Sequence, residues 1–189
     1  MLINEIFNVS SGQVMSRITT ETNEVEVRKV LLPKAINFGS VVESELVDNK
    51  MKVFLEPEKM SMEKDLIIKL STPYNGCIID SSTSGLVVPS FCAILRLKDY
   101  RYDLFYVLAY INSKAFAEQV LRLVTGNTIG ILSISQLKSL DIPLLPLEKQ
   151  KAIGNEFMKM SKNKQLLDRL INLQQEKIET LIAAGGKYE

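Results

Sequence analysis

The sequence of 189 residues contains no histidine and only two cysteines, Cys77 and Cys92. Without histidine, the chain lacks the most common general base, the base of a serine or cysteine triad, and the most common ligand of transition metals. Two cysteines are too few for a disulfide framework, and too few for a zinc site without other ligands. We therefore expect two buried structural thiols, and the sequence disfavours most hydrolytic and metal-dependent chemistry.

Other signatures are missing as well. The nine glycines nowhere take the spacing of a P-loop or a dinucleotide fingerprint, so we expect no nucleotide cofactor. No run approaches the roughly 20 apolar residues of a membrane-spanning helix, and residues 1–6 do not resemble a signal peptide. With 46% apolar and 24% charged residues, the chain can still bury a core. We expect a cytoplasmic protein with no membrane segment.

Two prolines mark a change of character along the chain. Pro143 and Pro146 remove amide donors and favour extended backbone before them, so residues 141–146 are predicted to form a connector. Residues 148–183 contain no proline and are rich in Lys, Glu, Gln, Leu and Ile, which predicts one long helix. The expected fold class is α+β: a mixed α/β domain over residues 1–146, followed by one long C-terminal coiled-coil helix over residues 147–189.

Residues 1–146 combine strand and helix patterns. Apolar residues recur at helical spacing from Asp103 to Val124, which predicts one helix packed on a sheet. Ser133 and Gln136 have the spacing of a capping box before a short helix that ends near Leu140. Short β-favouring runs separated by turn residues predict a meandering sheet. These runs are residues 66–70, 77–79, 86–88 and 91–95, with further candidates at 27–32 and 41–47 around a turn at 37–40.

Apolar residues in the long helix recur in steps of three and four from Ile153 onward. They fit a heptad seam with Lys164 and Gln174 as polar interruptions, which predicts a partner helix. The helix would be roughly 50 Å long, so it should project beyond a small domain. A helix folded back on its own domain remains the alternative. The residues assigned to the dimer or partner interface are Phe157, Met160, Leu167, Ile171, Ile178 and Leu181, and Leu166, Leu170 and Leu173 widen this apolar face.

Charge and loop composition bear on nucleic-acid binding. The formal net charge is only +1. Since phosphate neutralisation normally supplies much of the affinity for DNA, a DNA-binding role would require weak binding or charge from a partner. Three loops, residues 10–13, 81–85 and 125–128, are rich in small hydrogen-bonding residues of the kind that contact phosphates and base edges. Turns require the same residue types, so composition alone leaves both interpretations open.

The order of these features carries more information than any single one. Along the chain stand Glu63–Ile68, Pro73–Gly76, Val87–Phe91, Thr125–Ile129 and the run Leu137–Gln150, which leads into the heptad helix. In this order they resemble the specificity (S) subunit of type I restriction-modification enzymes over nearly the whole chain. The most specific part runs from the Thr-Gly-Asn-Thr loop to the Pro-Leu-Glu-Lys-Gln sequence that enters the helix.

The resemblance implies a function without catalysis or cofactor. In that family, a target recognition domain reads one half of an interrupted DNA sequence, and the long helices space two such domains. The implied partners are double-stranded DNA, DNA adenine methyltransferase (M) subunits and, in systems that cut, restriction (R) subunits. The residues carried over as DNA-binding candidates are Ser11, Gly12, Gln13, Arg17, Tyr74, Asn75, Ser84, Asn127 and Thr128.

The chain departs from the family pattern in having one recognition domain and one helix where two of each are usual. It is either a half-subunit that pairs with itself or another half, or a truncated product or isolated domain. We expect a homodimer with antiparallel helices. One alternative is a non-catalytic α/β ligand- or peptide-binding domain that dimerises through its C-terminal helix. Another is an enzyme whose nucleophile is Ser, Lys, Tyr or a carboxylate, although no spacing points to one.

Overall fold

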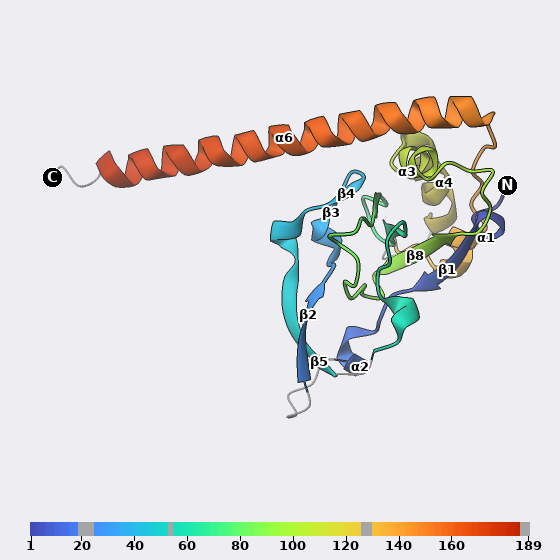
Figure 1. Cartoon of the computed structure of the whole chain (residues 1–189), viewed down its shortest axis with the longest axis horizontal. Coiled ribbons are helices and arrows are strands. Elements are labelled where there is room, and N and C mark those ends of the chain that lie inside the picture. Colours follow the sequence, from blue (N-terminus) through green and yellow to red (C-terminus); the bar gives the residue numbers. More distant parts are fainter. Residues whose placement is uncertain (19–24, 53–54, 126–129, 186–189) are drawn as a thin grey trace.

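The structure is a computed structural model that describes residues 1–18, 25–52, 55–125 and 130–185. It consists of an α+β domain from which one long helix projects (Figure 1). The helices are α1 (Ile3–Ile6), α2 (Met15–Ile18), α3 (Leu104–Ile111), α4 (Lys114–Val124), α5 (Ile134–Lys138) and α6 (Leu147–Gly185). The strands are β1 (Phe7–Ser11), β2 (Val25–Val30), β3 (Ile36–Asn37), β4 (Ser40–Val41), β5 (Val47–Lys52), β6 (Leu66–Lys69), β7 (Gly76–Ile78) and β8 (Cys92–Leu97). This arrangement confirms the predicted fold class.

A four-stranded antiparallel sheet, in the order β1-β8-β6-β7, forms the centre of the domain. All four residues of β6 are buried, because both faces of the sheet are covered. One face, with Leu66, Ile68 and Leu95, packs against α1, α3, α4 and α5. The opposite face, with Ile67 and Ile94, packs against the chain between β2 and β5. Helices therefore cover one side of the sheet and irregular chain covers the other.

The N-terminal strands form a separate ribbon and a hairpin. β2 pairs with β5, while β3 and β4 form a short hairpin whose turn residues, Phe38 and Gly39, have positive φ angles of 37° and 99°. The turn at residues 37–40 is thus confirmed. The predicted strand at 41–47 is wrong, because a 3₁₀ turn at Glu43–Glu45 divides it. The predicted strand at 86–88 is wrong too, because Val87 forms only isolated bridges. Two further 3₁₀ turns lie at Pro33–Ala35 and Pro57–Lys59.

The helix predicted from Asp103 to Val124 is two helices. Asp103 caps the start of α3, and Ser113 caps a new start at α4 by accepting a hydrogen bond from the Phe116 amide (3.3 Å). The Asn112 side chain donates to the Gly76 carbonyl (3.1 Å), which ties the break to β7. Apolar residues keep their helical spacing across this break. The break is therefore indicated in the sequence only by Asn112 and Ser113, which cap the two helices. Ser133 and Gln136 form the predicted capping box at α5.

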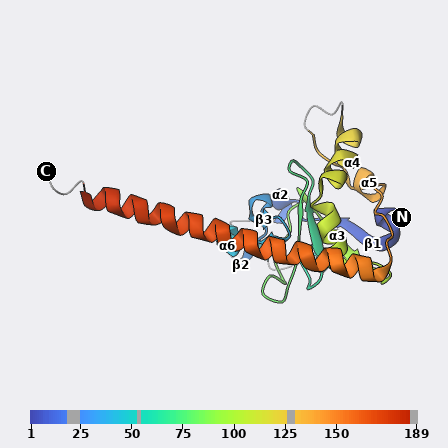
Figure 2. The ribbon, with the colours of Figure 1, turned by 90° about the horizontal axis from the view of Figure 1, so that it is seen from above.

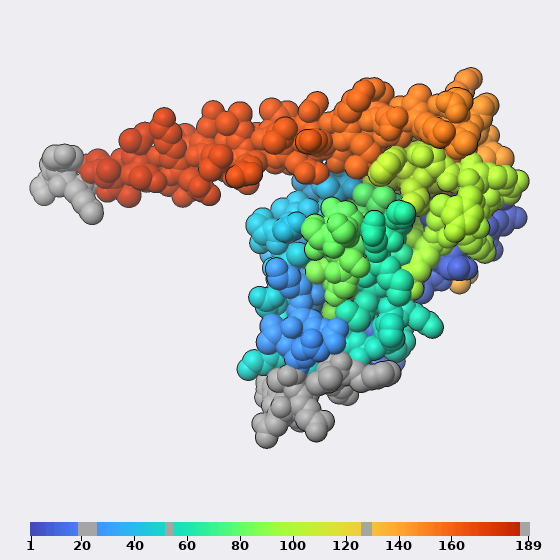
Figure 3. Space-filling model, in the orientation of Figure 1, coloured from blue at the N-terminus to red at the C-terminus, as the bar shows by residue number. Residues whose placement is uncertain are grey.

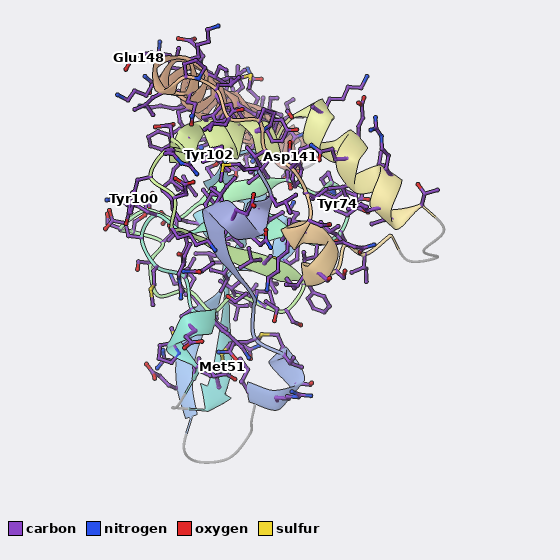
Figure 4. All side chains as sticks on the ribbon, turned by 90° about the vertical axis from the view of Figure 1, so that its right-hand side faces the viewer. Met51, Tyr74, Tyr100, Tyr102, Asp141 and Glu148 are labelled. Atoms are coloured by element: carbon purple, nitrogen blue, oxygen red, sulfur yellow. The ribbon has the colours of Figure 1, made fainter. Side chains whose placement is uncertain are left out.

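The connector at residues 141–146 is extended, as predicted, and leads into α6. Ile142 is held by the hydrogen bond from its amide to the Met1 carbonyl (2.9 Å). The hydroxyl groups of Tyr102 and Tyr106 donate to the carbonyls of Ile142 (3.1 Å) and Pro143 (2.8 Å). Tyr102 and Asp141 lie near the α6 end of the domain, whereas Met51 lies at the opposite end (Figure 4). The connector thereby fixes where the long helix begins.

Helix α6 contains 39 residues and, at 1.5 Å per residue, is about 58 Å long. Its docked half, residues 147–161, packs along α3 and the β3–β4 hairpin. Its outer half, residues 162–185, begins over the domain, where the Asn37 side chain donates to the Asp168 carboxylate (3.2 Å), and its C-terminal part extends past the domain in the space-filling view (Figure 3). Viewed from above, α4 and α5 lie to one side of α6 (Figure 2). The predicted long projecting helix is confirmed, and its first turns also complete the core of the domain.

Candidate nucleic-acid interface

One end of the four-stranded sheet collects most of the polar segments singled out in the sequence. β1 and β6 both run antiparallel to β8, which lies between them, so their C-terminal ends meet where β8 begins. The turn at residues 70–75 lies at this end, and residues 130–132 return to it, because the Leu132 amide donates to the Leu70 carbonyl (2.8 Å). We call this region the loop end. Asn127 and Thr128 lie outside the described residues.

Gly12 and Gln13 support the loop end from inside. A Cβ atom at Gly12 would lie 2.2 Å from the Val88 carbonyl oxygen, so only glycine fits where the chain crosses residues 88–89. Gln13 is 2% exposed, its amide donates to the Val88 carbonyl (2.6 Å), and its side chain donates to the Glu56 carbonyl (3.3 Å). Both were predicted to contact DNA. The structure corrects this interpretation, since neither side chain is accessible and both hold backbone segments together.

Tyr74 is a further correction. Its ring is 6% exposed and belongs to the core between the sheet and the helices, near the end of α4 (Figure 4). Its hydroxyl donates to the Gly130 carbonyl, which anchors the segment after residue 129. A buried aromatic ring cannot stack on a base. Tyr74 therefore positions the loop end and does not contact a ligand in this conformation.

Asn75 and Ser11 remain candidates by position. Both are half-buried, and the Asn75 Oδ1 atom is a buried side-chain oxygen for which the described residues supply no hydrogen-bond donor. Buried polar atoms are normally paired, so an orphaned amide oxygen indicates a missing partner. Ser11 is the last residue of β1. Ser11 and Asn75 therefore supply a hydroxyl group and a side-chain amide at the loop end.

Arg17 and Ser84 are both exposed, but they lie in different places. Arg17 is in α2, which follows β1 directly from the loop end. Ser84 lies after β7, and because β7 runs antiparallel to β6, that loop is at the opposite end of the sheet. Within it, the hydroxyl groups of Ser82 (2.8 Å) and Thr83 (2.8 Å) donate to the Asp80 carboxylate, which lowers the pKa of Asp80. The serine-rich composition here reflects a self-contained turn.

Phe91 is a loop-end residue that the sequence reasoning assigned only to a strand. Its side chain is 61% exposed, immediately before β8. Exposed aromatic rings beside polar loops are typical stacking or wedging groups in nucleic-acid interfaces. The only feature of the sequence that indicates this exposure is the preceding Pro89-Ser90, which lies just outside the strand together with Phe91.

The two cysteines are buried free thiols, as expected. Burial raises the pKa of Cys92 to about 12, and burial likewise raises the pKa of Cys77. Both are therefore protonated and unreactive at neutral pH. Within residues 1–18, 25–52, 55–125 and 130–185, no cluster of acidic and cysteine side chains is arranged to hold a metal ion. None of the helices in these ranges is long and apolar enough to cross a membrane.

The residues of α6 that were predicted to form the partner interface fall into two groups, one buried and one exposed. Phe157 is 6% exposed and packs against Phe38, with ring centroids 5.2 Å apart. Its assignment to the partner interface is therefore wrong, because its own domain covers it. The other assigned residues are Met160, Leu167, Ile171, Ile178 and Leu181, which are 49–61% exposed. Their exposure leaves them available to a partner, although Ile171 also lines the cleft between α6 and the domain.

Comparison with known proteins gives this fold a precedent. No family model and no curated protein matches the sequence. The HsdS subunit from Thermoanaerobacter tengcongensis aligns with 90% of this chain and 38% of its own chain, at 14% identity and a TM-score of 0.57. A structure from a study of complex assembly and conformational transition of the type I R-M system aligns with 96% of this chain and 42% of its own, at 16% identity and a TM-score of 0.60. The chain spans about two fifths of the length of either neighbour, and over that length it has the fold that the resemblance to S subunits predicts.

Proposed function

We propose that this chain is a DNA-sequence-specificity subunit of a type I restriction-modification system, with one target recognition domain and one spacer helix. The supporting observation is the fold likeness, which includes both the domain and the long helix in the same order. In this role the chain binds double-stranded DNA in the cytoplasm, reads one half of a bipartite target, and docks methyltransferase (M) subunits. Methyl transfer and cleavage belong to the M and R subunits, so we assign no catalytic residue or cofactor to this chain.

The loop end is the surface we assign to DNA. It combines hydrogen-bonding groups at Ser11 and Asn75, the exposed ring of Phe91, and the nearby cation of Arg17. Buried Gly12, Gln13 and Tyr74 hold this surface in shape from below. Phosphate contacts position a protein on DNA, whereas contacts to base edges give specificity, and the exposed residues here supply groups for both.

We assign the exposed apolar face of α6 to a second copy of the chain. This face runs from Met160 to Ile182, and its midpoint is Ile171. Two antiparallel helices that cross at Ile171 would bury both faces at once. The crossing point lies about 25 Å along the helix from Gly154, where α6 docks on its domain, so the two domains would lie about 50 Å apart. This separation corresponds to about 15 base pairs. Identical domains related by a two-fold axis require an interrupted palindrome.

The proposal is tested by purifying the tagged chain from its native lysate, identifying the subunits that accompany it, and measuring the mass of the complex by light scattering. We expect two copies of each subunit, and sequencing of modified bases in the host DNA should give an interrupted palindrome. An asymmetric bipartite site would rule out the homodimer. A dimer that binds no methyltransferase would favour the ligand- or peptide-binding alternative.

A matched pair of variants tests which end of the sheet meets DNA. Arg17→Ala should weaken binding to all sequences if Arg17 contacts phosphate, or relax one target position if it reads guanine. Ser84→Ala, at the opposite end, should leave binding unchanged. Binding isotherms on target and scrambled duplexes distinguish these results. A loss confined to Ser84→Ala would move the interface to the other end of the sheet.

A further inference from the structure

Lys69 is a buried cation beside a large cleft. It is the last residue of β6, it pairs with Cys92, and it is 9% exposed. Its side chain lines a cleft of about 930 Å³ between the sheet, the β3–β4 hairpin and the outer half of α6. A lysine at such a position normally extends its ammonium group to solvent or to a carboxylate.

Within the described part of the chain, the Lys69 ammonium group has no ion pair and no side-chain hydrogen bond. Burial lowers the pKa of Lys69, which reflects the cost of desolvating its charge. The neighbouring thiols of Cys77 and Cys92 do not neutralise it, because burial raises their pKa values and keeps them protonated. The Lys69 nitrogen atom is not fully buried, so the ammonium group reaches the cleft, where the described residues supply no ion-pair partner for it.

The carboxylates of the cleft are already engaged. Glu45 pairs with Lys34 (2.6 Å), and Asp168 pairs with Lys164 (2.7 Å). Asp168 also accepts a hydrogen bond from the side chain of Asn37, and Glu43 accepts one from Ser82 (3.3 Å). Glu45 and Asp168 are therefore paired with cations other than Lys69, whereas Glu43 is hydrogen-bonded to a hydroxyl group and keeps its negative charge.

The same cleft contains the orphaned amide of Asn75. An asparagine amide can turn about its last bond and present either its oxygen or its NH₂ group. Arg169 lines the cleft from α6, on the opposite wall. Thus Lys69, Asn75 and Arg169, which lie on different elements, line one space. Its volume is within the range of small-molecule binding sites.

We propose that this cleft binds a phosphate group, with Lys69 as its ionic partner and Asn75 and Arg169 as hydrogen-bond donors. A phosphate has several acceptor oxygens, which suits donor groups on different elements that line one cleft. The phosphate belongs either to the backbone of bound duplex DNA or to a small phosphate compound. The first source rests on the proposed function, and the second does not.

The test compares the wild-type chain with Lys69→Met and with a control, Lys98→Met, which removes an exposed lysine. Methionine fills the buried site without a charge, so Lys69→Met should fold and be at least as stable as the wild type. Thermal melts are recorded with inorganic phosphate at constant ionic strength. Binding to a labelled duplex is then measured over a range of salt concentrations.

Three outcomes are distinct. If phosphate at about five times its Kd raises the Tm of the wild type and Lys98→Met by about 2–4 °C but not that of Lys69→Met, the cleft binds a small phosphate compound. If phosphate has no such effect but Lys69→Met reduces the slope of log affinity against log salt by about 0.9, the phosphate comes from DNA. If Lys69→Met matches the wild type in both assays, the proposal is wrong. In that case, DNA binding by the wild type would leave the proposed function standing, and its absence would contradict that function as well.

Discussion

The docked half of α6 buries mainly small or polar residues against the domain, whereas the large apolar side chains of the outer half are all exposed. In the docked half the buried residues are Gln150, Gly154, Phe157 and Ser161, of which only one is large and apolar. The outer half carries eight large apolar side chains that are each 51–69% exposed. They are Leu166, Leu167, Leu170, Ile171, Leu173, Ile178, Leu181 and Ile182.

This contrast distinguishes two kinds of helix contact. The docked half approaches its domain closely, through a glycine and through side chains that hydrogen-bond to backbone carbonyls, as Ser161 does to Phe38 (2.8 Å). The outer half presents a broad apolar surface that would interdigitate with another helix. Because exposed apolar surface of this extent is typical of interaction sites, the second contact is the one that needs a partner. Variants that act on one half and not on the other test this distinction.

The largest effect is expected from Gly154→Leu. A Cβ atom there would lie 2.8 Å from the Tyr106 amide nitrogen and 2.8 Å from the Phe105 Cβ atom, so α6 would have to move away from α3. Helix propensity alone favours leucine over glycine by about 1 kcal/mol, but overpacking should reverse the sign and cost about 3 kcal/mol or more. Urea unfolding of the dilute, monomeric chain measures the loss. Ala152→Leu, on the exposed side, is the control and should unfold like the wild type.

Gln150→Leu should have the next largest effect. The Gln150 side chain is fully buried, donates to the carbonyls of Arg101 (3.0 Å) and Leu145 (2.8 Å), and accepts from the Asp103 amide (2.8 Å). Leucine fits the volume but leaves these backbone groups unpaired, which should cost about 2–3 kcal/mol. Gln175→Leu, in the exposed outer half, provides the comparison. Equal unfolding curves for the two variants would mean that the docking of α6 does not depend on this network.

The sequence predicts the long helix, its start and the buried thiols, because periodicity, proline and composition act locally. It also predicts the turn at residues 37–40. It fails where two local signals compete. Apolar spacing continues from Asp103 to Val124 although caps at Asn112-Ser113 interrupt the helix. Similarly, Phe157 fits the heptad seam, but it lies one turn from Gly154 and so shares the face that docks on the domain.

The DNA candidates were harder to predict, because burial is decided by distant parts of the chain. The side chains of Gln13 and Tyr74 look like loop residues in the sequence, yet segments 43 and 56 residues away engage them. Ser84 was grouped with the other loops by composition, although strand direction puts it at the opposite end of the sheet. For Phe91, the preceding Pro89-Ser90 is the only signal of exposure, and the apolar run that follows outweighs it by making Phe91 look like the first residue of a strand.

Ser161→Ala should have a smaller effect than either docking variant above. It removes the hydrogen bond from Ser161 Oγ to the Phe38 carbonyl (2.8 Å), so we expect a loss of about 1 kcal/mol. Ser44→Ala, at an exposed site, controls for the change in hydroxyl content. Urea unfolding measures both variants. If Ser161→Ala cost as much as Gln150→Leu, the hairpin would be as important as α3 for docking α6.

The smallest effect on unfolding, and the sharpest test of the comparison, is expected from the double variant Leu167→Asp, Ile171→Asp. Both side chains are more than half exposed in the single chain, so unfolding of the dilute monomer should change by less than about 0.5 kcal/mol. At high concentration, carboxylates in an apolar interface should prevent association, and light scattering should give half the mass of the wild type. The control, Gln165→Asp with Asn172→Asp, adds the same charge at two polar positions of the same segment of α6 and should remain dimeric. If the double variant unfolds easily but still associates, the comparison is wrong. The apolar face of the outer half would then stabilise the single chain and would not be the surface that binds a second copy.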